Sequence, residues 1–412
     1  MEPIGAPLRH RRVLPYVLVG AGFTLLGGGI AGYFRLPAYA KQTAEARALE
    51  QGVELHAEAA DVGFGWVRLR GVTFSPVGVT GVRGTSDRVT VELNGLTPTR
   101  VTTRSAALEI EGPVSAVVGQ LDAWSKRFPA AARPPLAADG IALAWREAAG
   151  ATPWLDVADA SAQTDAGAGT FYAPKSTLFG VSAGELALTW AAGRNDVLVG
   201  LGNRDPNQAP LRLEATSGTP LKGRLHIART PLPSLGALLG VAINEPDVSA
   251  EATLGLTLSP GAPLDLIEGH ADVALHGYVP PHPRELQGIV YGKTTKLGTN
   301  FRVAADRRSA ALTNTTLQAG GLSLRGAGSI ERHDPGARAK LDMRGQVPCG
   351  ALARSAVTAN LGDNLLGDIV GGLAGATLRG ALTVNVHIEA DTKDLDRARV
   401  TPVVSGDCGL GF

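Results

Sequence analysis

From residue 53 onward, apolar and polar residues alternate along the chain with a period of two. In the stretch 89–93, for example, three apolar residues at odd positions are separated by Thr90 and Glu92. This alternation is typical of strands that bury one face of a sheet and expose the other. The other alternating runs are 67–69, 141–145, 186–190, 197–201, 254–258, 273–275, 301–303, 322–324 and 382–388. The pattern therefore predicts a mostly β chain.

Turn-forming residues separate these runs. The turn signals are Asn94-Gly95, Asp139-Gly140, 193–196, 261–263 and 333–336. Short strands joined by such turns are typical of an antiparallel sheet with one apolar and one polar face. We therefore expect many short antiparallel strands in a sheet with one apolar face.

The alternation changes parity once near the start of the β-rich region. Leu69 is followed by apolar residues at Val72 and Phe74, so the apolar positions move from odd to even numbers across Gly71. An extra residue in a strand produces such a shift, and glycine is common where it occurs. The sequence therefore predicts a β-bulge at Gly71.

A few segments have helical character instead. Residues 38–50 are good helix formers and precede Gly52, while 114–128, 231–243 and 352–373 carry apolar residues at helical spacing. We expect these short helices to cap open ends of the sheet or to cover part of it. The helix-rich region near 228–250 separates two β-rich segments, which we place at 53–230 and 231–412.

Residues 13–34 contain no Asp, Glu, Lys, Arg or His and follow a basic tail, residues 1–12. At about 1.5 Å per residue, a helix of this length is long enough to cross the roughly 30 Å hydrocarbon core of a bilayer. The preceding arginines favour a cytoplasmic N-terminus, so residues 35–412 would lie outside the cytoplasm, beginning with a juxtamembrane helix at 35–52.

A cleavable signal peptide is the alternative for this segment. Ala38-Tyr39-Ala40 has the small-x-small pattern that precedes a cleavage site. The apolar stretch is longer than the 7–15 residues usual in signal peptides, and this favours an uncleaved anchor. Either interpretation exports the rest of the chain.

The charge composition argues against nucleic-acid binding. The chain has 39 Lys and Arg against 38 Asp and Glu, and no basic run follows the apolar segment. Proteins that bind nucleic acids concentrate positive charge on one surface or in one segment. We therefore expect no nucleic-acid partner.

The chain has two cysteines, Cys349 and Cys408. In an exported protein, an isolated pair favours one disulfide. Closing a loop of about 60 residues would stabilise the fold by about 4 kcal/mol in the chain-entropy model. Two buried free thiols are the alternative, and a two-ligand metal site is less favoured because no further ligand lies at metal-binding spacing.

The motifs that suggest catalysis lack the required context. Residues 180–184 match the G-x-S-x-G nucleophile elbow around Ser182, but the residues that follow alternate like a strand, where the elbow requires a helix. His270, His276 and His282 are spaced by six residues, about 20 Å along a strand, too far apart to share a metal ion. The sequence predicts no enzyme activity, no metal site and no cofactor.

The N-terminal anchor and certain strand phrases resemble those of AsmA-like proteins of the Gram-negative envelope. The resemblance rests on the segment from Val62 to Leu93, with its VRLRGV stretch at 67–72, and on a second L-x-L-x-G phrase at 322–328. It implies a long, curved antiparallel β-sheet, shaped as a groove or a folded trough with an apolar inner surface. The protein would be held at the inner membrane with its bulk in the periplasm. It also implies a role in carrying phospholipids or in envelope assembly.

An extended apolar sheet face with few helices to cover it must either close as a sandwich or leave a groove. An exposed apolar groove is expected to have a ligand, and outside a cytoplasmic membrane a phospholipid or another acyl-chain lipid is the expected one. The predicted groove residues are Leu69, Val91, Leu188, Leu256, Leu324 and Val384. The alternative function is a non-catalytic scaffold that docks other envelope proteins through a sheet edge or the 352–373 segment.

Overall fold

The computed structural model describes residues 37–94, 97–128, 134–192, 196–239, 243, 245–261, 264–278, 293–320, 322–333, 336–349, 377–407 and 409–411. Most of these residues lie in strands, and three helices accompany them. The described chain forms two compact units. The first contains the residues up to Gly223 together with Leu258–Asp265, and the second contains Arg224–Thr257 and the residues from Leu266 onward. The predicted mostly β class is confirmed.

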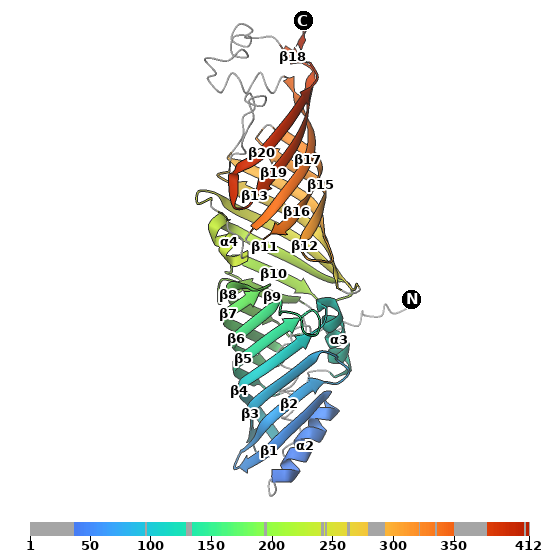
Figure 1. The fold of residues 1–412 in the computed structure, drawn as a ribbon. Coiled ribbons are helices and arrows are strands. Elements are labelled where there is room, and N and C mark those ends of the chain that lie inside the picture. Colours follow the sequence, from blue (N-terminus) through green and yellow to red (C-terminus); the bar gives the residue numbers. More distant parts are fainter. Residues whose placement is uncertain are drawn as a thin grey trace, which may run out of the picture. The chain divides into compact units, whose positions relative to one another are not determined.

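The first unit contains ten strands that pair in chain order (Figure 1). They are β1 (Val53–Gly63), β2 (Trp66–Pro76), β3 (Val82–Asn94), β4 (Thr97–Glu111), β5 (Leu136–Arg146), β6 (Leu155–Asp165), β7 (Ala168–Leu178), β8 (Val181–Trp190), β9 (Asp196–Leu201) and β10 (Leu211–Thr216). All these neighbours are antiparallel except β4 and β5, which are parallel. The predicted antiparallel sheet is thus confirmed with one exception.

Two helices cover the apolar face of the first unit. They are α2 (Pro37–Glu50) and α3 (Val114–Arg127), close to the predicted 38–50 and 114–128. A parallel pair needs a crossover, and α3 supplies it between β4 and β5. Leu121 and Trp124 of α3 belong to the same buried cluster as the inward residues of the strands. The Trp124 indole N–H also donates a hydrogen bond to the Gly52 carbonyl at 2.7 Å, which fixes α3 to the end of α2.

A row of kinks crosses the first unit. In each strand from β1 to β7, the alternation of buried residues is interrupted by two consecutive residues that are not buried. Gly71, Ser105, Gly140 and Asp159 at these positions have φ between 56° and 67°. The interrupted positions are 58–59, 70–71, 87–88, 104–105, 139–140, 158–159 and 174–175. Because the kinks lie opposite one another, the apolar residues before and after them stay on the same face of the sheet.

Two sequence predictions need correction at this row. The parity change at Gly71 is present. The register of β2 with β1 and with β3 does not shift across Gly71, so neither pair contains an extra residue. The change is therefore a kink shared by the strands and not a β-bulge. Asp139-Gly140 was predicted as a turn and lies inside β5. Both predictions were made from the sequence of one strand. The kink occurs in each strand from β1 to β7, which the sequence of one strand does not reveal.

The positive φ of Gly140 gives a testable consequence. Gly140→Ala should destabilise the protein by about 1–2 kcal/mol, because a side chain in the left-handed region is strained. Gly119→Ala is the matched control: Gly119 lies in α3 with nothing within 4 Å of an added Cβ, so it should stabilise by about 0.5–1 kcal/mol. Thermal or urea unfolding measures both, and equal effects in the two variants would contradict the kink's role.

The second unit contains seven strands that pair antiparallel in chain order. They are β13 (Leu266–His276), β14 (Thr294–Val303), β15 (Ser309–Ala319), β16 (Leu322–His333), β17 (Gly336–Pro348), β19 (Ala381–Asp391) and β20 (Asp394–Ser405). Most residues of β11 (Leu221–Pro231) and β12 (Ser249–Ser259) also belong to this unit. In each unit the sheet is curved (Figure 1).

The remaining elements are short. Helix α4 (Leu232–Leu239) occupies most of the predicted 231–243 helix, and β18 (Thr377–Arg379) pairs with β21 (Gly409–Gly411). The predicted helix at 352–373 and the predicted membrane span at 13–34 both lie outside the described residues. Among the helices that the structure describes, none combines the length and the apolar character needed to cross a membrane.

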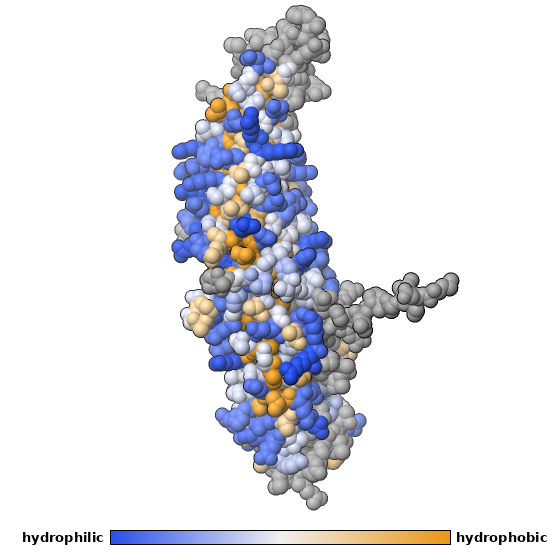
Figure 2. Space-filling model, turned by 90° about the vertical axis from the view of Figure 1, so that its right-hand side faces the viewer, coloured by the Kyte–Doolittle hydropathy of each residue, from blue (hydrophilic) through white to orange (hydrophobic). Residues whose placement is uncertain are grey.

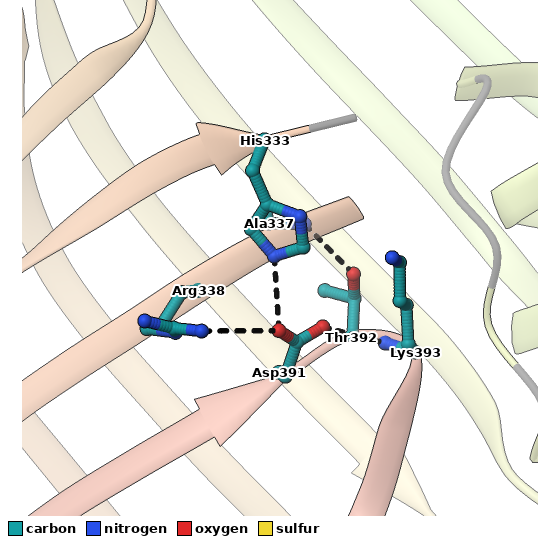
Figure 3. A network of polar contacts seen from close by, with 6 residues as sticks. All are labelled: His333, Ala337, Arg338, Asp391, Thr392 and Lys393. Atoms are coloured by element: carbon teal, nitrogen blue, oxygen red, sulfur yellow. Dashed lines mark hydrogen bonds and ion pairs between the residues drawn. The ribbon is translucent and has the colours of Figure 1, made fainter. Parts of the chain in front are cut away.

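A polar network joins two hairpin turns of the second unit (Figure 3). The Asp391 carboxylate lies 2.9 Å from His333 Nε2 and accepts a hydrogen bond from the Lys393 backbone N–H at 3.0 Å. This backbone hydrogen bond lowers the pKa of Asp391, with further contributions from His333 and Arg338. Thr392 Oγ1 accepts a hydrogen bond from the Ala337 N–H at 2.9 Å. The network ties the end of β16 and the start of β17 to the β19–β20 turn.

The pairing of His387 with Asp342 predicts a pH dependence of stability. His387 Nδ1 lies 2.7 Å from Asp342 across β19 and β17, and this hydrogen bond raises the His387 pKa above its usual 6.5. A raised pKa in the folded state adds stability that is complete below pH 6.5 and is lost as the pH rises through the folded-state value. His387→Gln should therefore lower the unfolding midpoint more at acidic than at alkaline pH.

Asp342→Asn removes the negative charge that faces His387 and should reduce the pH dependence in the same direction. Thermal unfolding of both variants and the wild type across pH 5 to 9 makes the comparison. A pH-independent difference between wild type and His387→Gln would show that the pair contributes nothing through its charge.

Candidate functional site

The inner face of the second unit is built from apolar residues that lie opposite one another on seven successive strands. The first row runs through Val273, Leu297, Leu317, Leu324, Gly345, Val384 and Val404. The second row runs through Gly269, Phe301, Leu312, Gly328, Leu341, Ile388 and Val400. We call these the apolar rows. No charged residue interrupts either row.

At two positions of the rows, a glycine leaves space that a leucine of the neighbouring strand fills. A Cβ added to Gly345 would lie 2.7 Å from Leu324 Cδ2, and one added to Gly328 would lie 2.6 Å from Leu341 Cδ2. Leu324 therefore occupies the space that a side chain at position 345 would take, and Leu341 occupies the space that a side chain at position 328 would take. Between the rows, Thr299 and Thr315 are buried and hydrogen-bond to each other through their hydroxyls at 2.8 Å, so their polarity is satisfied internally.

Burial falls off across the rows. Leu324 and Val384 at the centre are buried, whereas Phe301, Leu317, Ile388 and Val400 are only partly buried. Val404, at the end of the first row, is 36% exposed. Every described member of this buried cluster belongs to a strand. Figure 2 shows hydrophobic residues reaching the surface of this unit in a strip bordered by hydrophilic residues.

Figure 2 shows hydrophobic residues at the surface of the first unit as well, but in this unit two helices contribute to the core. Its inward residues form one large buried cluster with α2 and α3. Val67, Leu69, Val89 and Val91 on β2 and β3 have no exposed surface. The inner face of the first unit is thus filled by the protein's own side chains at these positions.

The size of the apolar rows suits an acyl chain. Seven strands spaced by about 4.8 Å make a row roughly 29 Å long. Since the hydrocarbon core of a bilayer is about 30 Å thick, the acyl chains of one leaflet extend about 15 Å. One row is therefore long enough for the alkyl tail of a membrane lipid.

The structure brings two of the six predicted groove residues together. Leu324 and Val384 lie in the same row, joined through Gly345. Leu256 lies on β12 and is partly buried. Leu188 packs against the core of the first unit, while Leu69 and Val91 lie fully inside that core. As lipid contacts, these last two would require the first unit to open.

Sequence reasoning missed several members of the rows. Leu317, Leu341 and Val400 stand in strands whose alternation is weak, because alanine, threonine or proline occupies neighbouring positions of the same parity. Val404 follows Val403, so alternation alone does not show which of the two faces inward. Strand register supplies the answer, because Val404 lies opposite Val384 and Val403 opposite Asn385.

The residues considered for catalysis occupy ordinary strand positions. Ser182 is the second residue of β8, which continues to Trp190, so no helix follows it and the elbow geometry is absent, as expected. His270 pairs with Asn300 at 2.8 Å, and His276 lies 3.6 Å from Glu251. His282 lies outside the described residues. Among those described, no group of three or more His, Cys, Asp or Glu side chains forms a metal site.

Cys349 at the end of β17 is disulfide-bonded, and its backbone N–H donates a hydrogen bond to the Gly380 carbonyl at 3.1 Å. Its Sγ lies 4.0 Å from the carbonyl oxygen of Asp407. The chain's other cysteine, Cys408, follows directly in the sequence and lies outside the described residues. A bond between the two remains a prediction that this placement supports.

The predicted disulfide can be tested directly. Non-reducing peptide mapping should recover a peptide pair joining Cys349 to Cys408. Cys349→Ser and Cys408→Ser should each destabilise the second unit by about 4 kcal/mol or less, the limit for a loop of about 60 residues. Two alkylatable thiols in the oxidised protein would contradict the bond.

Comparisons of this chain with protein-family models, with curated proteins and with solved structures find no match. The site therefore has to be interpreted from its own geometry.

Proposed function

We propose that this protein binds the acyl chains of lipids on the apolar rows of its second unit, without catalysing a reaction. The observation that carries the proposal is the register. Apolar residues on seven strands lie opposite one another in two uninterrupted rows, and part of that surface is exposed.

The chemistry of the rows favours an alkyl chain over a polar ligand. Burying apolar surface stabilises by about 25 cal/mol per Å², or about 0.8 kcal/mol per methylene. The rows offer that contact along their whole length but present no hydrogen-bonding group to orient a ligand. Binding would therefore depend on the length of an alkyl chain more than on its headgroup, and would accept phospholipids of different classes.

The expected location agrees with this ligand. The predicted span at 13–34 would hold the protein at the inner membrane as a single-pass protein with a cytoplasmic N-terminus. The bulk would then lie in the periplasm, beside the outer leaflet of that membrane. Together with the resemblance to AsmA-like proteins, this supports a role in moving or holding lipids for the envelope and the outer membrane.

A non-catalytic scaffold for other envelope proteins is the second candidate. The observation that favours it is on β20, where Val403 is 61% exposed and Val404 is 36% exposed on the opposite face. Exposed apolar residues on a strand suit docking of another protein. Crosslinking in cells would then yield a stoichiometric protein adduct at β20, whereas a lipid carrier gives bound lipid without one.

Val404 and Val403 provide a matched test. The protein, purified from native membranes in mild detergent, should carry lipid that mass spectrometry detects. Val404→Asp should reduce the bound lipid about tenfold or more, because a carboxylate against an alkyl chain loses its hydration without a partner. Val403→Asp adds the same charge to the neighbouring position on the other face and should leave the bound lipid unchanged.

Both variants are surface substitutions and should change stability by no more than about 0.5 kcal/mol. Unfolding measurements check this, so that loss of lipid is not mistaken for loss of fold. Equal lipid content in Val404→Asp, Val403→Asp and the wild type would sink the proposal.

A further inference from the structure

The outward face of the first unit brings together three arginines on neighbouring strands. Arg70 of β2 lies directly opposite Arg88 of β3, and Arg88 lies directly opposite Arg104 of β4. All three are exposed. Strands are spaced by about 4.8 Å, and like charges placed directly opposite each other destabilise a sheet. A row of three therefore has a cost to folding.

These arginines line a cavity of about 510 Å³. Arg68 lines it as well, two residues along β2 from Arg70, and the same cavity includes Asp87 and hydroxyl-bearing residues of β3 and β4. Thr90 lies directly opposite Arg68. The charged lining is thus four arginines against one aspartate, which leaves an excess of three positive charges.

The carboxylates near the row leave most of this charge uncompensated. Asp61 forms an ion pair with Arg70 at 3.0 Å. Asp139 lies opposite Arg104 on β5, and the Glu58 carboxylate lies over Gly71. Neither of these two forms an ion pair with Arg88 or Arg104, whose side chains make no hydrogen bond or ion pair with any described residue.

Arg68 adds a second cost to folding at the same cavity. Its Nε is buried and makes no hydrogen bond within the described part of the chain. Its guanidinium lies over the Trp66 ring, 4.8 Å from the ring centroid, which restrains the side chain at the cavity. A buried donor without an acceptor costs free energy, so the fold holds Arg68 at this cavity at a cost.

We propose that Arg68, Arg70, Arg88 and Arg104, the arginine cluster, bind a phosphate group. Guanidinium groups donate paired hydrogen bonds to phosphate oxygens in a planar geometry, and several on adjacent strands can share one group. The bound anion would also remove the repulsion along the row. The phosphate can belong to the headgroup of an anionic phospholipid or to a soluble phosphate compound, and the site's chemistry is common to both.

Pyrophosphate is the first probe, measured by calorimetry on the full chain in neutral detergent at constant ionic strength. The double variant Arg88→Gln with Arg104→Gln should bind it at least tenfold more weakly than the wild type. The control removes two exposed strand arginines elsewhere, Arg83→Gln with Arg325→Gln, and should bind like the wild type. Equal affinity in the two double variants would overturn the proposal.

The unfolding midpoint gives an independent readout. Without ligand, the Arg88→Gln, Arg104→Gln variant should be as stable as the wild type or more so, because the repulsion is reduced. Pyrophosphate should raise the midpoint of the wild type and of the control but not of this variant. A variant that is less stable without ligand and still gains stability from pyrophosphate would overturn the proposal, because the arginines would then serve the fold.

Short-chain lipids identify the source of the phosphate. Displacement of pyrophosphate by dihexanoyl phosphatidylglycerol, and much weaker displacement by dihexanoyl phosphatidylcholine, supports an anionic lipid headgroup. Displacement by neither supports a soluble phosphate compound. Val404→Asp lies in the other unit and should leave pyrophosphate binding unchanged, so this result is independent of acyl-chain binding.

Discussion

Successive residues of a β-strand point to opposite faces of its sheet, and this constraint governs the whole molecule. An alternating sequence produces an apolar face that is far larger than the three short helices of the described chain can cover. Each unit responds differently. In the first unit, α2 and α3 pack on the apolar face and join its buried cluster. In the second unit, all described members of the buried cluster lie in strands.

The kinks of the first unit are what allow its face to close. Where the strands bend, two consecutive residues point away from the core, and the apolar residues on either side still face the same interior. The same bend places Arg70, Arg88 and Arg104 in one row on the outside. One backbone feature therefore positions both the core and the arginine cluster, on opposite faces of the same strands.

The two proposed sites have complementary chemistry. The apolar rows can bury alkyl chains but offer no group that recognises a headgroup, and the arginine cluster can bind a phosphate but offers no apolar contact. Each stands on its own residues and its own unit. Both kinds of chemistry are found in molecules of a membrane surface, and this agrees with the membrane location that the first 34 residues predict.

The sequence by itself determined the class of structure, since the period of two along 53–412 specifies strands, and short helical stretches specify α2, α3 and α4. It also indicated which side chains are apolar enough for a site, including Leu324 and Val384. It did not determine which strands share a row, because register depends on pairing between segments far apart in the chain. That is why Val404 could not be separated from Val403, why the three opposed arginines were not recognised, and why Leu69 appeared equivalent to Leu324. Packing separates Leu69 from Leu324. The same alternation leads to a filled core around Leu69, where helices pack on the sheet, and to a partly exposed apolar face around Leu324, where the described cluster consists of strands alone.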